Sequence, residues 1–498
     1  MHRTSRSKIT GLFALGIATL FLSACKKDAK NTVQKPNVLF IAIDDLNDYV
    51  NCMNGSIRAY TPNIDKLAKA STLFTNAHCQ APICGPSRAS IMTGLYPATS
   101  GNYLQLKDQN IVKSNKASQA AIFMPDYFEQ HGYKTMAVGK IYHNGDDAKT
   151  FDEYGGKFAW MGPKPQKRFK YDPAWFDEKK GSTQTDWAAY PEQDSLMTDF
   201  QSAQWAVHKL QQKHDKPFFM GVGFVRPHVP WYAPQKWFDM YPLEDIQTPP
   251  YNPNDFDDIP AMGQRVADVP MMPTTEELIK AKEWKKAIQA YLACISFVDA
   301  QLGKVLNALE NSDYANNTIV VLWADHGYHL GEKNRFAKQA LWERDTRTLL
   351  TIKTPDGIQN QTSNAPVQLL DIYPTLTDLC KLPPNKLNEG NSLVPILTNS
   401  KVQTIHPALS FYGVGNVAVR TEDYRLMQYE DGSIEFYDMK NDPNEWHNLA
   451  NDKKHQQTIA EMKTFIPKKW APLSKYNAFS VNPYFKEKSK NNRKKQLP

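Results

Sequence analysis

The chain has 498 residues, of which 41% are apolar, 11% aromatic and 22% charged, and its formal net charge is +7. A chain of this length and composition can bury a large core, which argues against a largely disordered protein. A weakly basic charge tolerates polyanionic partners without identifying one, and we expect no nucleic-acid partner.

The first 24 residues have the pattern of an export signal. Arg3, Arg6 and Lys8 precede an apolar run, Ile9–Leu22, that is short for a membrane-spanning helix. Small residues then lead to Cys25, an arrangement that resembles a bacterial lipobox and implies cleavage before Cys25 and lipidation of that residue. A plain secretory signal is the alternative.

Lipidation of Cys25 would make the protein an exported lipoprotein that is anchored to a membrane. Residues 25–35 would form a short polar tether ahead of the fold. Because Lys26 rather than an aspartate follows Cys25, we expect the outer membrane, with the protein facing the periplasm or displayed at the cell surface.

Four buried apolar runs along the chain end in residues that can do chemistry. They are Asn37–Ile43 before Asp44 and Asp45, Thr135–Val138 before Lys140 and His143, Phe218–Val225 before Arg226 and His228, and Thr318–Trp323 before Asp325 and His326. Continuous apolar runs predict parallel strands that are covered on both faces, and such sheets bind ligands beyond the carboxyl ends of their strands. We therefore expect the four ends to meet.

The segments between these runs have the apolar spacing of helices. The predicted helices are Ile64–Leu73, Pro125–His131, Met197–Lys213 and a long one over Trp284–Leu309. Strands that alternate with helices predict an α/β sandwich with a large, mostly parallel central sheet. Two irregular stretches, Gly145–Pro191 and Pro242–Pro273, interrupt this alternation. They are either loops that overhang a pocket or simple surface packing.

The pattern changes near residue 400. Short runs at Ala408–Tyr412, Asn416–Arg420, Tyr424–Tyr429 and Glu435–Asp438, followed by a helix over Gln456–Phe465, predict a small antiparallel sheet with one helix. We therefore divide the mature chain into a catalytic α/β domain over 36–400, a C-terminal subdomain over 401–475 and a basic tail over 476–498. The tail should be frayed from Lys486 onward.

Cys84 lies in a stretch that reads as the start of a helix. Pro86 suits the first turn and Gly94 suits the end. The free backbone N–H groups of such an N-terminus favour an anion, and Arg88 adds a fixed charge. A single cysteine is more often a small buried apolar residue, so this motif depends on its surroundings.

Cysteine usage leaves pairing open. Five cysteines follow Cys25, namely Cys52, Cys79, Cys84, Cys294 and Cys380. An odd number in an exported chain means that at least one thiol stays unpaired or is modified. Cys79 and Cys84 could bridge across a short loop, and pairing among the others is not determined.

The residues at the strand ends form two chemical groups. Asp44, Asp45 and Asp325, with His326, offer mostly oxygen ligands that suit a hard divalent cation. The cationic and titratable residues Arg88, Lys140, His143, His228 and Lys338 would surround the same point if the strand ends converge. Together they indicate chemistry on an anionic group.

The segment Cys84-Gly85-Pro86-Ser87-Arg88 resembles the Cys-x-Pro-Ser-Arg signature of type I sulfatases. Further landmarks follow in the family's order: Asp44-Asp45, Gly132–Lys140, Arg226–His228, Asp325–Gly327, Phe436–Asp438 and Asp442–Glu445. Within the family the chain most resembles the iduronate-2-sulfatase group, through Gly139–His143, His326 and Leu330–Glu332 ahead of Ala337-Lys338. With the lipobox, this describes a bacterial lipoprotein sulfatase that acts on polysaccharide.

This resemblance implies an alkaline-phosphatase-like fold and a modified nucleophile. A formylglycine-generating enzyme or an anaerobic sulfatase-maturating enzyme would convert Cys84 to formylglycine (3-oxoalanine), whose hydrate attacks sulfur. Calcium would be held by residue 84 together with Asp44, Asp45, Asp325 and His326. Because an imidazole is a softer ligand than calcium prefers, His326 could instead lie in the shell behind the ligands.

The resemblance also implies roles for the cationic residues. Lys140, His228, Lys338 and Arg226 would bind the sulfated substrate, and Arg88 would hold the hydrate. His228 would protonate the leaving sugar oxygen, and His143 would act as the base that regenerates the aldehyde.

The substrate implied is a sulfated glycan. A 2-O-sulfated uronate such as iduronate, in a glycosaminoglycan or in ulvan, is favoured over a sulfated rhamnose, fucose or galactose unit. A phosphatase or phosphonate hydrolase of the same superfamily, and a non-catalytic lipoprotein that binds sulfated glycans, are the alternatives. The sequence does not determine exo or endo action, the oligomeric state, or whether Cys84 is matured in a given host.

Overall fold

The computed structural model describes residues 35–496 except 56, 145–149, 158–161, 167, 170–184, 405 and 478–481. The chain from Lys35 onward forms one compact unit. The predicted signal peptide, Cys25 and all of the tether but residue 35 lie outside the described residues, as does part of the Gly145–Pro191 insert.

A large sheet runs through the molecule. Its nine strands are β1 (Asn37–Ile43), β2 (Thr72–His78), β3 (Lys134–Gly139), β4 (Glu153–Tyr154), β6 (Phe218–Phe224), β8 (Thr318–Ala324), β9 (Arg347–Lys353), β10 (Gln361–Ser363) and β11 (Val367–Gln368). They follow the order β10-β2-β9-β8-β1-β6-β3-β4, and β11 pairs with β2. The four predicted strands β8, β1, β6 and β3 are adjacent and parallel. This confirms the mostly parallel sheet.

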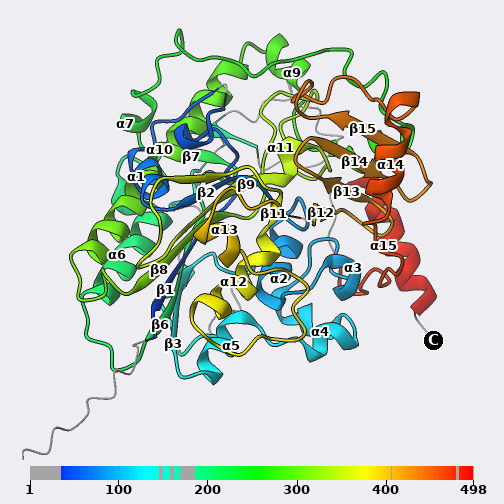
Figure 1. The fold of residues 1–498 in the computed structure, drawn as a ribbon. Helices are drawn as coiled ribbons and strands as arrows, with labels where there is room; N and C mark the ends of the chain where they lie inside the picture. Colours follow the sequence, from blue (N-terminus) through cyan, green and yellow to red (C-terminus); the bar gives the residue numbers. More distant parts are fainter. Residues whose placement is uncertain are drawn as a thin grey trace, which may run out of the picture. The chain divides into compact units, whose positions relative to one another are not determined.

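Helices cover both faces of this sheet (Figure 1). One layer contains α1 (Pro62–Lys69), α6 (Thr198–Leu210) and α10 (Trp284–Glu310), and the other contains α2 (Cys84–Thr93), α5 (Met124–Gln130), α12 (Ile372–Leu379) and α13 (Val394–Thr398). Alternate residues of β1 enter the two cores, Leu39 and Ile41 on one side and Val38 and Phe40 on the other. Although α10 is long and apolar enough to cross a membrane, most of it is buried in the first core.

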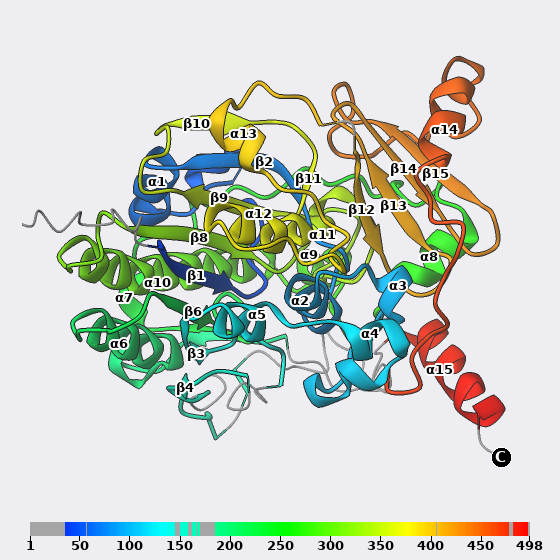
Figure 2. The same ribbon diagram turned by 60° about the horizontal axis from the view of Figure 1, so that its bottom comes forward.

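A second, antiparallel sheet forms the C-terminal part (Figure 2). Its strands are β12 (Ala408–Phe411), β13 (Val417–Arg420), β14 (Tyr424–Gln428) and β15 (Ile434–Asp438), followed by α14 (Gln456–Lys463). The amide of Phe411 donates to the carbonyl oxygen of Gln80 at 2.8 Å. The small sheet is thereby tied to the chain just ahead of α2. This architecture was predicted.

Shorter elements make up the connections. They are α3 (Pro97–Ser100), α4 (Lys116–Ala120), β5 (Trp187–Ala189), which pairs with β7 (Trp231–Ala233), α7 (Gln235–Phe238), α8 (Ala261–Ala267), α9 (Thr275–Lys280) and α11 (Glu343–Thr346). The second irregular stretch, Pro242–Pro273, ends beside the segment that leads to Lys338, because the amide of Phe336 donates to the carbonyl oxygen of Pro273.

Two sequence predictions are wrong in detail. The helix predicted over Ile64–Leu73 ends at Lys69, and Thr72 begins β2, whose residues Leu73 and Phe74 face the interior. The tail is not frayed from Lys486, because α15 (Pro483–Gln496) includes it. Phe485 anchors that helix by packing on Tyr412, with ring centroids 4.6 Å apart.

Candidate active site

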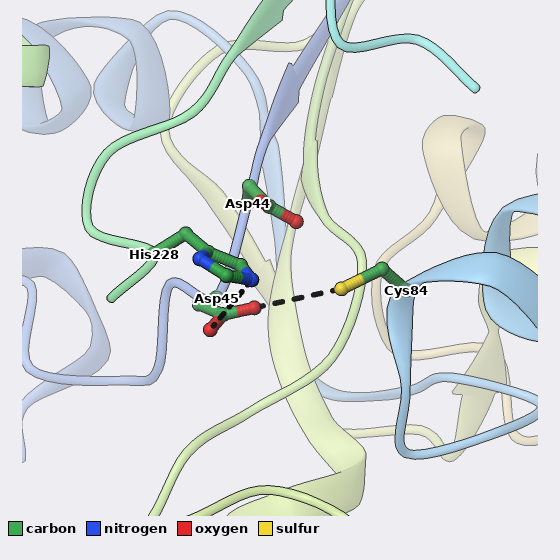
Figure 3. Close-up of side chains that lie close together, drawn as sticks. All are labelled: Asp44, Asp45, Cys84 and His228. Carbon is green, nitrogen blue, oxygen red and sulfur yellow. Dashed lines mark hydrogen bonds and ion pairs between the residues drawn. The ribbon is translucent and has the colours of Figure 1, made fainter. Parts of the chain in front are cut away.

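The four strand ends meet at one point, as predicted from their apolar runs. Ile43, the last residue of β1, is level with Phe224 at the end of β6 and with Ala324 at the end of β8. The residues that follow these strands are therefore delivered to the same edge of the sheet. Figure 3 shows four side chains of this site, Asp44, Asp45, Cys84 and His228, the first two carried by the end of β1.

Asp44 lies fully buried between two cations. Lys140 Nζ is 2.5 Å from Oδ2 and Arg88 Nη2 is 3.2 Å from Oδ1. Burial by itself raises the pKa of Asp44, but Lys140, His228 and Arg88 bring it well below its usual value. Arg88 also donates through Nε to Asp325 at 2.8 Å, so it joins two strand ends.

Asp45 faces the opposite side of the site. Lys338 Nζ lies 2.5 Å from Asp45 Oδ1 and 3.0 Å from the sulfur of Cys84. The other oxygen, Oδ2, is buried with no hydrogen-bond partner, and His228 Nε2 is 3.9 Å away. Asp45 thus offers an open oxygen inside the site.

Cys84 is the first residue of α2, as expected, and is almost completely buried. Gly94 ends the helix with φ +72°. Burial and then Asp44 raise the pKa of the Cys84 thiol, although Lys140 and Lys338 oppose this. A thiol held in its protonated form is a poor nucleophile. The structure therefore does not favour Cys84 acting as a thiolate.

Two histidines point their Nε2 atoms into the site. His326 Nε2 lies 3.3 Å from both Cys84 Sγ and Asp45 Oδ1, while its Nδ1 pairs with the carbonyl oxygen of Gly327 at 2.8 Å. A carbonyl can only accept, so Nδ1 carries a proton and Nε2 is the nitrogen that faces the site. His228 is held in the same way, by Nδ1 donating to Val229 at 2.6 Å.

His143 contacts a residue that sequence reasoning missed, Gln105. Gln105 Oε1 accepts the backbone N–H of Gly85 at 2.8 Å, so its amide nitrogen faces His143 Nε2, 2.5 Å away. That nitrogen donates, and His143 Nε2 must therefore accept, with the ring proton on Nδ1. Gln105 lies in a loop without a recognisable pattern, and no sequence signal pointed to it.

Arg226 is buried and binds the backbone around His228. Its guanidinium donates to the carbonyl oxygens of Tyr232 at 3.0 Å and of His228 at 2.8 Å. These bonds fix the backbone that carries His228. Its described contacts make Arg226 a support for that histidine.

The acidic residues fit a divalent cation. Two overlapping groups, Asp44, Asp45, Cys84 and His228, and Asp44, Cys84, Asp325 and His326, each place their ligand atoms within 4.8 Å of one another. Three carboxylates suit a hard cation such as calcium, and the partnerless Oδ2 of Asp45 is available to it. Within the described site, Arg88, Lys140 and Lys338 already balance these carboxylates. A bound cation would therefore leave an excess of positive charge for an anion.

The described cysteines do not form disulfides. Cys52, Cys79, Cys84, Cys294 and Cys380 are all free thiols. The bridge between Cys79 and Cys84 left open by the sequence is absent. Cys84 is therefore available for modification.

Family models and curated proteins match most of this chain. The model of the family "Sulfatase" matches residues 36–382, and that of "N-sulphoglucosamine sulphohydrolase, C-terminal" matches residues 331–470. A sulfatase from Formosa agariphila is 48% identical, over 95% of this chain and 94% of its own. Mouse (Mus musculus) iduronate 2-sulfatase is 31% identical, over 71% of this chain and 64% of its own. An ulvan-active sulfatase from Formosa agariphila is 28% identical, over 97% of this chain and 91% of its own.

Solved structures share the fold of this chain. A phosphonate monoester hydrolase from Silicibacter pomeroyi superposes with a TM-score of 0.69 at 20% identity, covering 86% of this chain and 94% of its own. At that identity the likeness establishes the fold alone. The expected alkaline-phosphatase-like architecture is confirmed.

Proposed function

The chain belongs to the sulfatase family, and we propose that this sulfuric ester hydrolase removes sulfate from a sulfated polysaccharide or its oligosaccharides through a formylglycine formed from Cys84. The observation that carries the proposal is the position of Cys84, at the start of α2 and 3.0 Å from Lys338 Nζ. Carboxylates for a cation and ammonium groups for an anion surround that one atom.

The favoured substrate unit is a 2-O-sulfated uronate such as iduronate, in a glycosaminoglycan or in ulvan. The 31% identity to an iduronate 2-sulfatase and the likeness to an ulvan-active sulfatase support this choice. The group Gly139–His143 and His326, which follows the iduronate-2-sulfatase pattern, supports it as well.

Positive side chains would bind the sulfate group. Lys140 pairs with Asp44 and Lys338 pairs with Asp45. A sulfate beside residue 84 would therefore lie between the two ammonium groups. Arg88 lies behind residue 84 and keeps Asp44 and Asp325 in place. These side chains would offset the charge that develops on the sulfate oxygens.

Two groups that the chain would carry complete the chemistry. A calcium ion held by Asp44, Asp45, residue 84, Asp325 and His326 would withdraw charge from the sulfate, and the hydrated aldehyde of residue 84 would supply the nucleophilic hydroxyl. His326 binds the Gly327 carbonyl through Nδ1 and turns Nε2 toward Cys84, which agrees with a ligand role for Nε2. A sulfatase-maturating enzyme is the partner needed to form the aldehyde.

His228 is the proposed acid that protonates the leaving sugar oxygen. Burial lowers the pKa of His228 to about 3, against the opposing effect of Asp45, so the ring is neutral before substrate binds. An anionic substrate favours the charged ring and raises this pKa, which prepares Nε2 to donate. Arg226 contributes by fixing the His228 backbone.

His143 is the proposed base of the second half of the reaction. Its Nε2 accepts from Gln105, whose other end binds the N–H of Gly85. To act as a base, His143 Nε2 would give up its hydrogen bond from the Gln105 amide and accept a proton from a hydroxyl of residue 84. Gln105 therefore controls access to that nitrogen.

The test is a comparison of matched substrates. Enzyme produced with a maturating enzyme should release sulfate from a 2-O-sulfated uronate disaccharide, and should turn over an aryl sulfate faster than the corresponding aryl phosphate or phosphonate. Faster phosphate or phosphonate turnover would favour the hydrolase alternative. Glycan binding without any sulfate release by protein that carries the aldehyde would favour the non-catalytic alternative.

We also propose that the mature protein is a lipoprotein of the outer membrane, anchored through Cys25. The basic n-region, the apolar run Ile9–Leu22 and the small residues before Cys25 support this location. An anchored sulfatase facing the periplasm or the cell surface would meet imported or external polysaccharide.

A further inference from the structure

Asp45 holds its place in the site through an unusual backbone conformation. Its φ angle is +60°, in the left-handed region that residues with a side chain rarely adopt. Such a conformation persists only where the surrounding structure fixes it. The carboxylate of Asp45 pairs with Lys338 and offers its open Oδ2 to the site, so its direction depends on contacts that hold the Asp45 backbone.

Tyr291 of α10 makes contacts that fix this turn. Its hydroxyl donates to the carbonyl oxygen of Asp45 at 2.7 Å and accepts the N–H of Asn47 at 2.9 Å. On the other side, the N–H of Asp45 donates to Asp325 Oδ1 at 3.1 Å. The peptide groups before and after Asp45 are thus held from two elements, the segment that follows β8 and helix α10.

Tyr291 is itself held firmly in the core. Its side chain is completely buried, and its ring packs against the rings of Trp231, Tyr49 and Tyr328, with centroids 5.8, 6.4 and 6.2 Å away. Burial raises the pKa of its hydroxyl well above the ordinary value, so the group stays protonated and able to donate. A fixed hydroxyl on a long core helix therefore sets the position of the Asp45 carbonyl.

Loss of this hydroxyl would leave two buried backbone groups without a partner. Asp45 and Asn47 are completely buried, so bulk water does not reach them, and unpaired backbone groups are costly there. The turn would change its backbone angles to satisfy them. Any such change redirects the Asp45 side chain, because the direction of the Cα–Cβ bond follows the backbone.

We propose that Tyr291 is a positioning residue that holds Asp45 in its left-handed conformation and thereby directs the Asp45 carboxylate toward a calcium ion. The proposal rests on the calcium site of the proposed function. It adds to that site a residue that contacts neither the ion nor the substrate and acts through Asp45 alone.

The chain offers a matched control for this tyrosine. The hydroxyl of Tyr314 donates to the carbonyl oxygen of Gln212 at 2.8 Å and accepts the N–H of His214 at 2.9 Å, the same bridge between residues two apart. Tyr314 packs on Phe218, the first residue of β6, with ring centroids 5.2 Å apart. It therefore lies at the end of the strand opposite to the site.

The experiment measures calcium affinity directly. Wild type, Tyr291→Phe and Tyr314→Phe are produced with a maturating enzyme, freed of metal, and titrated with calcium by calorimetry at a temperature well below every Tm. For Tyr291→Phe we expect the Kd for calcium to rise about tenfold or more, the effect typical of groups that orient metal ligands. Tyr314→Phe should stay within about twofold of wild type.

The calcium dependence of activity gives a second readout. Sulfate release by Tyr291→Phe should need about tenfold more calcium to reach half of its maximum, and saturating calcium should restore most of the wild-type kcat. A rate that stays low at saturating calcium would overturn the proposal, because Tyr291 would then act on a step other than metal binding.

The remaining outcomes separate this proposal from the proposed function. Equal calcium affinity in wild type and Tyr291→Phe would overturn the role of Tyr291, as would equal weakening in Tyr291→Phe and Tyr314→Phe. Absence of calcium binding by wild type would contradict the calcium site and this proposal with it. Wild type that binds calcium but releases no sulfate from any substrate would instead contradict the proposed function.

Discussion

At the scale of single residues, Cys84 has a position that suits its modified form better than its thiol. Burial raises the pKa of the thiol, while Lys338 lies 3.0 Å from its sulfur. Cys84→Ala should remove sulfate release while leaving the fold intact, because no hydroxyl nucleophile can form. Sulfate release and circular dichroism measure the two effects, and mass spectrometry of the wild-type peptide should find an aldehyde. Substantial sulfate release by Cys84→Ala would contradict the formylglycine mechanism.

Gln105 provides a second prediction at this scale. Gln105→Leu keeps the volume but removes both hydrogen bonds, to Gly85 and to His143. We expect kcat to fall about tenfold, a part of what a positioned base contributes, with KM changed less than about threefold. Gln105→Glu retains the acceptor for Gly85 and should recover part of the rate. A change in KM alone would show that Gln105 only contacts substrate.

At the scale of elements, α11 fastens the small sheet to the catalytic part. Glu343 accepts from Arg420 Nε at 2.9 Å and Arg425 Nη2 at 2.5 Å, residues of β13 and β14. Glu343→Gln leaves these buried guanidinium groups without full compensation, which should lower the free energy of unfolding by about 3–5 kcal/mol. Chemical denaturation measures it. The exposed pair Lys66–Glu310 is the control, since Glu310→Gln should cost under about 1 kcal/mol.

The same group has a predictable pH dependence. Burial raises the pKa of Glu343, but Arg420 and Arg425 bring it well below the usual 4.5. A lowered folded-state pKa gives stability that is present above pH 4.5 and is lost as the pH falls through the folded value. The stability gap between wild type and Glu343→Gln should therefore shrink in acid. A gap that stayed constant across that range would contradict this assignment.

Some strands of the large sheet could be predicted from the sequence and others could not. The strands with uninterrupted apolar runs, β1 and β8 among them, were predicted almost to the residue. β2 was missed because it follows α1 after only two residues. β9, which lies antiparallel to both of its neighbours, was missed as well. Neither strand has a local apolar pattern that distinguishes it.

At the scale of the whole molecule, a divalent cation should couple activity to stability. Asp44, Asp45 and Asp325 come from two strand ends, so an ion held by all three stabilises the folded state, and the more so the further its free concentration exceeds its Kd. Removing calcium with a chelator should lower Tm and stop sulfate release, and adding calcium should restore both. Scanning calorimetry measures the shift in Tm. Asp45→Asn lacks one of the proposed ligands, so calcium should raise its Tm less. A Tm that is insensitive to calcium would contradict a calcium site.

The location of the molecule gives a further prediction. Cys25→Ala removes the proposed lipidation site and should move the protein from the membrane fraction to the soluble fraction of its host. Cys52→Ala is the control and should stay with the membrane. Fractionation with immunoblotting measures the distribution. An unchanged membrane association of Cys25→Ala would contradict the lipid anchor.

The sequence by itself determined the central parallel sheet and the residues that its strand ends carry. Buried parallel strands leave continuous apolar runs, and Asp44, Asp45, Lys140, His228 and Asp325 each follow such a run directly or within a few residues. Only the tertiary structure decided which distant side chains join them. Gln105 comes from a loop without periodicity, and its role follows from contacts across the fold, with His143 and with the backbone N–H of Gly85.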